Sequence, residues 1–351
     1  MQKTALVVGA TGVIGRGLVD HLIDLGDWRV IGAQRHPPGG PRPESLRYVA
    51  VDLLDPVDTA AKAPALADVT HVFYAAFVDA PTQAEQVAPN LALLRNLIER
   101  ATPAMNALQR LVLVEGNKWY GSHLGPFRTP AKEDDPRCPP PMFYHDQQDF
   151  LEAGAAGRPW SWTALRPQTV CGFSLGSAMN LMTAIGVYAS LRKHQGLPLD
   201  FPGKPGAFRA IYQVTDARHL AKAQVWAATS PDAADRPFNV TNGDFFRWQN
   251  VWPRLAEHFG MAPGGIETQR LADTMPPLAS LWDELVRTHD LQPHAMDALV
   301  KWPFADYVWS SDWDVMTATT RIRQAGFQDV VDSEDMLLDI LTAFRRERIV
   351  P

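Results

Sequence analysis

The sequence predicts an α/β protein: a doubly wound parallel sheet with a smaller, mainly helical domain. Three observations predict it. The apolar residues 6–8 lead through a glycine-rich turn into an amphipathic helix. Apolar strands and helical segments then alternate as far as residues 161–165, which is typical of a parallel sheet covered on both faces. From Gly172 onward helices with aromatic-rich connections follow.

The glycine-rich turn is typical of a Rossmann-type phosphate-binding connection. Gly9 can adopt the tight turn, Gly12 allows the backbone to approach a pyrophosphate, and Gly15 lets the helix lie close to the strand. The first-turn amides, together with the positive end of the helix dipole, would face the anion. Because tight strand-to-helix connections also favour glycine, the motif gains its weight from its place after the first strand.

The remaining elements follow from periodicity and caps. Strands are expected at 28–33, 48–51, 69–76, 110–114, 161–165, 211–214 and 238–241. Helices are expected from the glycine turn to a stop at Gly26, over 83–101, from residues 142–145, after a cap at Asp216, and over 248–259 and 333–346. We therefore expect a dinucleotide-binding domain over residues 1–172, to which 211–241 partly returns, and a substrate-binding cap over 173–351.

Composition excludes several classes of protein. The chain has 351 residues, a net charge of −6 and no long basic run, so nucleic acid and anionic membranes are not expected partners. Two cysteines, Cys138 and Cys171, cannot form a disulfide framework and lack metal-ligand spacing. No apolar run reaches about 18 residues, and the first strand leaves no room for a signal peptide. We expect a soluble, cytoplasmic protein with a small-molecule substrate and no metal, which could form a homodimer.

The ends of the early strands predict the cofactor. An acidic residue after the second strand would hold a ribose hydroxyl, whereas Arg35, found here instead, suits a 2′-phosphate, so NADP(H) is expected. The alternative is that Arg35 is a solvated surface arginine. Asp52 and Leu53 follow the third strand, where adenine commonly lies, and small residues after Tyr74, beginning with Ala75, leave space for the cofactor.

The usual catalytic pair of a short-chain dehydrogenase, Tyr-x-x-x-Lys, is missing. Tyr144 is followed at that spacing by Gln148, and Tyr188 by Arg192. Lys118 lies just after the fifth strand and is expected beside the helix that Tyr144 begins. Its ammonium would polarise the phenol, which could then donate to a substrate carbonyl oxygen. The alternative is that Tyr144 is only an aromatic residue at the end of a helix and that Lys118 is only a surface cation.

At these residues the chain resembles the progesterone 5β-reductase and iridoid synthase family of enone reductases, an atypical branch of the extended short-chain dehydrogenases. The matching segments span essentially the whole chain: 68–74, 118–120, 125–127, 143–144, 166–167, 172–174, 179–181, 193–199, 239–244 and 348–351. The resemblance implies that Lys118 and Tyr144 are catalytic. It also implies NADPH-dependent reduction of an activated C=C bond, in which hydride reaches the β-carbon, the tyrosine hydrogen-bonds the nascent enolate, and water protonates the α-carbon.

The resemblance also assigns binding residues. Thr11, Gly12 and Val13 would contact the phosphates, and Arg35 the 2′-phosphate, with His36 where a second arginine is common. Further cofactor contacts are expected from Gly9, Gly15, Asp52, Leu53, Tyr74, Ala75, Lys118, Tyr144, Thr169, Val170 and Ser174. A pocket for a flat apolar substrate would be lined by Phe77, Trp119, Leu124, Phe127, Met179 and Phe304, each of which alone is equally consistent with plain core.

The sequence departs from the family pattern in four places. Trp119 replaces a histidine, residues 121–123 lengthen the following loop, His145 replaces a second tyrosine, and Glu115 stands where threonine is usual. We expect Glu115 to pair with Lys118.

The leading hypothesis for the function is an enone 1,4-reductase. The alternatives are a carbonyl reductase or alcohol dehydrogenase using the same site, and a non-catalytic NADP(H)-sensing regulator.

Overall fold

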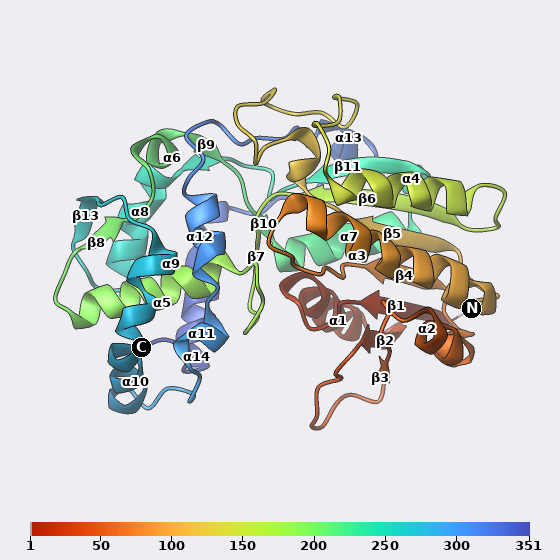
Figure 1. The fold of residues 1–351 in the computed structure, drawn as a ribbon, viewed down its shortest axis with the longest axis horizontal. Coiled ribbons are helices and arrows are strands. Elements are labelled where there is room, and N and C mark those ends of the chain that lie inside the picture. The colour runs from red at the N-terminus through yellow and green to blue at the C-terminus, as the bar shows by residue number, and fades with distance from the viewer. Residues whose placement is uncertain (1) are drawn as a thin grey trace.

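A parallel sheet forms one half of the protein and a helical cap the other (Figure 1). The computed structural model describes residues 2–351. The seven strands run in the order β11-β6-β5-β4-β1-β2-β3 and all pair in parallel. Their bounds are β1 Lys3–Val8, β2 Trp28–Gln34, β3 Leu46–Ala50, β4 His71–Tyr74, β5 Arg110–Val114, β6 Ser161–Pro167 and β11 Arg236–Val240.

Helices cover both faces of this sheet, because alternate residues of each buried strand point to opposite sides. In β1, Ala5 and Val7 join the core beneath α1 and α7, whereas Leu6 and Val8 join the core beneath α3 and α4. The helices of this half are α1 Val13–Leu25, α2 Pro56–Lys62, α3 Gln83–Asn96, α4 Phe143–Ala155 and α7 Ala217–Thr229.

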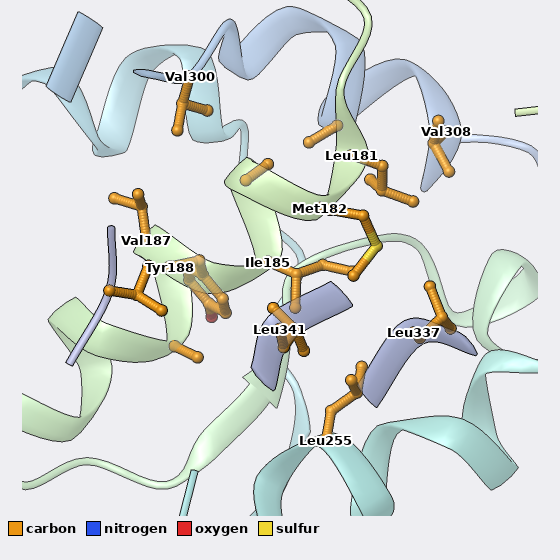
Figure 2. Packing of buried hydrophobic residues seen from close by; sticks show 14 of the residues in the cluster. Leu181, Met182, Ile185, Val187, Tyr188, Leu255, Val300, Val308, Leu337 and Leu341 are labelled. Carbon is orange, nitrogen blue, oxygen red and sulfur yellow. The ribbon is translucent and has the colours of Figure 1, made fainter. Parts of the chain in front are cut away.

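The cap is built around α5, Leu181–His194, in which residues 181–191 are all buried. A helix that is apolar on all sides belongs at the centre of a core. Figure 2 shows Met182, Ile185 and Tyr188 of α5 near Leu337 and Leu341 of α14. The other cap helices are α6 Pro205–Arg209, α8 Trp248–His258, α9 Leu271–Thr274, α10 Ala279–Thr288, α11 Met296–Leu299, α12 Trp302–Val308 and α14 Ser333–Arg346. The short helix α13, Thr320–Gln324, lies beside β11 in the sheet half, where Ile322 joins the core beneath α1 and α7.

Local signals explain the elements that were predicted. Gly26 ends α1 in the left-handed region, with φ 74°, and its N–H donates to Ile23 O. The Asp216 carboxylate accepts the backbone N–H of Arg218 and caps α7, as expected. Within residues 2–351, no helix has both the length and the apolar character needed to cross a lipid bilayer.

Three predictions of bounds or pairing were wrong. The segment 211–214 does not form a strand of the main sheet: β9, Ile211–Tyr212, pairs with β12, Phe246–Arg247, and β10, Thr215–Asp216, pairs with β7, Val170–Cys171. The predicted helix 83–101 changes at Leu97 into a π-helical turn, where Asn96 Nδ2 donates to Leu53 O. Strand β4 is shorter than 69–76 because the chain after Tyr74 turns aside to line a cleft.

Candidate active site

A cleft of about 470 Å³ lies at the carboxyl ends of β1, β2, β3 and β4. This is the edge where open α/β sheets bind ligands. Its lining includes these residues with predicted binding roles: Gly9, Thr11, Gly12, Val13, Gly15, Arg35, Asp52, Leu53, Ala75, Phe77 and Met179. The glycine turn after β1, the ends of β2, β3 and β4, and one cap segment thus meet around one space.

The glycine turn requires its glycines. Gly9 has φ 84°, and a Cβ there would lie 2.9 Å from Ala75 O. A Cβ on Gly15 would lie 2.1 Å from Gly9 O, so the helix could not pack this closely against the turn. Gly12 is the N-cap of α1, no side chain caps the helix, and no acidic residue lies in its first turn. The free amides of this helix end therefore fit the pyrophosphate of a dinucleotide.

Arg35 follows β2 directly and lines the cleft. Its side chain is exposed and forms no ion pair with any residue of 2–351, so its charge is available to an anion. His36 is exposed and lies outside the cleft lining, and its carbonyl accepts a hydrogen bond from Gln34 Nε2. Asp52 is held by its neighbours, since its carboxylate accepts from Leu54 N and its own N–H donates to Asp58.

Besides His36, and apart from Lys118 and Tyr144, which are described below, four predicted cofactor residues lie outside the cleft lining: Tyr74, Thr169, Val170 and Ser174. The Tyr74 side chain is buried in the core on the α3 and α4 face, which corrects its predicted place beside the cofactor. Thr169 has φ 25° and its hydroxyl lies 2.7 Å from Tyr212 Oη. Val170 belongs to β7. The Ser174 hydroxyl donates to Thr11 O across 3.4 Å and so connects the cap to the glycine turn.

Tyr144 and Lys118 both lie near the end of β5. Lys118 belongs to the 3₁₀ turn Asn117–Tyr120, and Tyr144 is the second residue of α4. A Cβ on Gly116 would lie 3.1 Å from Tyr144 Oη, so the phenol lies over the residue that joins β5 to this turn. The rings of Phe143 and of the cleft residue Phe77 are 5.7 Å apart, which places the start of α4 beside the cleft.

The Lys118 amine contacts a residue that the sequence did not indicate. Its Nζ lies 4.7 Å from the ring centre of Tyr307 in α12, and no hydrogen bond joins it to Tyr144 in the described chain. Burial lowers the pKa of Lys118, and the nearby Asp79 raises it again. Burial, followed by Glu115 and Tyr307, raises the pKa of Tyr144. At neutral pH Tyr144 is therefore a protonated phenol and a hydrogen-bond donor.

The expected pair between Glu115 and Lys118 is wrong. Glu115 Oε2 accepts from Arg166 Nε at 2.8 Å, and both side chains are buried. The reason is strand register: Val114 of β5 stands opposite Leu165 of β6, so the next residues along each strand are also neighbours. Burial raises the pKa of Glu115 to about 7, although Arg166 opposes the shift.

Trp119 also differs from its predicted role. Its side chain is buried, and the Arg166 guanidinium lies 3.5 Å from the centre of its ring. His145 meets the ring edge-on at 4.5 Å. Trp119 therefore packs against the buried ion pair and not on the cleft.

The other three predicted pocket residues lie outside the cleft lining. Leu124 is exposed, and Phe127 packs between the Trp119 cluster and the cap core. Phe304 packs on the cap core, with its ring centre 6.2 Å from that of Tyr307. Tyr307 thus connects Phe304 to Lys118.

Together the parallel sheet, the glycine turn at the α1 N-terminus and the separated tyrosine and lysine define an atypical short-chain dehydrogenase/reductase. The chain belongs to the PRISE-like Rossmann-fold domain family, which matches residues 50–351. It is accordingly an oxidoreductase, and the resemblance noted in the sequence is confirmed.

Relatives of known name align with this chain over its full length. The chain is 35% identical to an (S)-8-oxocitronellyl enol synthase of Nepeta racemosa and 32% identical to a 3-oxo-Δ(4,5)-steroid 5β-reductase of Arabidopsis thaliana, covering 100% of this chain and 94% of each relative. Among solved structures, WbmG of Bordetella bronchiseptica in complex with NAD matches with TM-score 0.69 and 16% identity, over 100% of this chain and 96% of that one. The UDP-glucose 4-epimerase of Thermus thermophilus in complex with NAD gives TM-score 0.67 and 18% identity, over 97% and 99%.

Proposed function

We propose that the protein is an NADPH-dependent reductase of activated C=C bonds that stabilises an enolate with Tyr144. The observation that carries this proposal is the protonated Tyr144 phenol over the end of β5, beside the turn that holds Lys118. The relatives support it, because a relative that aligns with the whole chain is named as a reductase of 3-oxo-Δ(4,5)-steroids, which are enones.

The cleft supplies the cofactor contacts in this proposal. The backbone around Thr11, Gly12 and Val13 binds the diphosphate, and Arg35 binds the 2′-phosphate. Asp52 and Leu53 border the adenine end. When bound, NADPH supplies the hydride that reaches the β-carbon.

Residues of the protein then stabilise the negative charge that develops on the substrate. The Tyr144 hydroxyl donates a hydrogen bond to the carbonyl oxygen, and this bond strengthens as the enolate forms. The Lys118 ammonium contributes positive charge on the same side. Phe77 and Met179 offer apolar walls that suit a flat substrate. In this proposal water protonates the α-carbon.

Product analysis with 2-cyclohexenone and NADPH tests the proposal. We expect consumption of NADPH and formation of the saturated ketone. Formation of the allylic alcohol would replace the proposal with carbonyl reduction on the same site. No NADPH oxidation across a panel of enones, aldehydes and ketones would indicate an NADP(H)-sensing regulator instead.

Replacing Arg35 by alanine tests the cofactor. We expect the Kd for NADPH to rise by about 10- to 100-fold, since a charge-assisted contact to phosphate is worth about 1.5–3 kcal/mol. The Kd for NADH should change little. Fluorescence titration with both nucleotides measures this, and Arg29→Ala within β2, also an exposed arginine, is the matched control. Equal weakening of both nucleotides would contradict the assignment.

A further inference from the structure

In the Tyr-x-x-x-Lys arrangement one helix carries both catalytic residues and so fixes their relative position. Here Lys118 and Tyr144 lie on different segments of the chain, so another contact must hold these segments together. Lys118 lies in the turn Asn117–Tyr120 and Tyr144 in α4. Residues 121–142 separate them, and no direct hydrogen bond between their side chains is present in residues 2–351. Another group must therefore fix the turn against the helix.

Arg166 supplies this contact between the two segments. Its Nη1 donates to Tyr120 Oη at 3.0 Å, and its guanidinium stacks on Trp119 at 3.5 Å, so it holds the turn that carries Lys118. Its Nη2 donates to Gln148 Oε1 at 2.8 Å. Gln148 lies one helical turn after Tyr144 on α4, at the position where the usual pair has its lysine. One buried guanidinium thus contacts both catalytic segments.

Glu115 orients this guanidinium through the 2.8 Å bond to Nε. A buried arginine needs such a counter-charge, because desolvation of an unpaired cation is costly. Only one carboxylate oxygen is used: Oε1 is buried and has no hydrogen-bond partner in the described chain. The Glu115 charge therefore acts on its surroundings with little screening, and Tyr144 is among the groups that it affects.

Other charged groups also face this carboxylate. They are Arg166 on β6, Arg137 in the loop before α4, and Glu152 on α4. Arg166 Nη1 also donates to Tyr120 Oη and, at 3.3 Å, to the Glu133 carbonyl. The two arginines lower the pKa of Glu115 and Glu152 raises it, while burial places it near 7. Glu115 is thus anionic above about pH 7, where it forms the ion pair with Arg166.

We propose that the Glu115–Arg166 pair is the positioning device of this active site: Glu115 orients the Arg166 guanidinium, which holds the Lys118 turn against the Tyr144 helix. The pair consists of positioning residues, because neither is placed on the cleft lining. This role rests on the proposed function: a wild-type protein that reduces no enone would contradict the proposed function, whereas wild-type turnover that the double variant below leaves unchanged would contradict the positioning role alone.

The double variant Glu115→Gln/Arg166→Met tests whether Arg166 holds the two catalytic segments together, and it leaves no uncompensated charge from this pair in the core. We expect kcat to fall by about 100-fold, because the two catalytic segments lose their common anchor, with the Kd for NADPH unchanged. The matched control is Arg192→Met/Asp200→Asn, which removes a largely buried ion pair in the cap. An unchanged kcat in the Glu115/Arg166 variant, or an equal fall in the control, would overturn the proposal.

Discussion

Replacing Tyr144 by phenylalanine is expected to lower kcat for enone reduction by about 100- to 1000-fold, the size of effect seen when one donor to a developing oxyanion is removed. The substitution removes a hydroxyl whose pKa is raised by burial and by Glu115, and which is therefore held as a donor. The ring still packs against Phe143, at 4.3 Å between centres, so the start of α4 should keep its place. Steady-state kinetics together with NADPH fluorescence titration measure the two effects separately.

The control for this prediction is Tyr188→Phe. That hydroxyl is also buried and donates to Asp200 O at 3.1 Å in the cap core, away from the cleft. Its removal should lower stability by about 1 kcal/mol and leave kcat as it is. If Tyr144→Phe kept more than about a tenth of the wild-type kcat, the oxyanion role would be refuted.

The second large effect is expected from Gly15→Ala. The added Cβ would lie 2.1 Å from Gly9 O and 2.8 Å from Ala10 Cα, both backbone atoms that have no freedom to rotate away. The glycine turn must then open from α1, which displaces the amides that face the phosphates. We expect NADPH affinity to fall by at least about 100-fold and the free energy of unfolding to drop by about 2–3 kcal/mol.

Gly39→Ala is the matched control, since a Cβ there meets nothing within 4 Å and its φ is not in the left-handed region. It should leave both nucleotide binding and stability unchanged. Normal NADPH binding by Gly15→Ala would show that the tight β1–α1 contact does not shape the phosphate site.

Sequence periodicity and caps predicted the elements whose signals are local. Strand β5 and helix α14 have the predicted bounds, Arg110–Val114 and Ser333–Arg346, because buried apolar runs and helix caps depend on adjacent residues. Pairing of the short strands β9 and β10 could not be predicted in this way. Two residues carry no periodicity, and their partners lie elsewhere in the chain.

In the candidate site, too, local motifs could be predicted from the sequence, whereas contacts between distant segments could not. The glycine turn and Arg35 line the cleft as their motif predicted. The partner of Glu115 depends on the register of β5 against β6, and the position of Trp119 depends on Arg166, so neither follows from a family pattern in which position 115 is threonine. Tyr307 was missed because α12 comes into contact with Lys118 only through the packing of the cap.

A crystal structure of the protein with NADP⁺ and an unreactive cyclic carbonyl compound tests the central claim most directly. Our account predicts that the ligand carbonyl oxygen lies about 2.7 Å from Tyr144 Oη, at hydrogen-bond distance, with the β-carbon facing nicotinamide C4. A carbonyl oxygen bound away from Tyr144, or a carbonyl carbon facing C4, would contradict it.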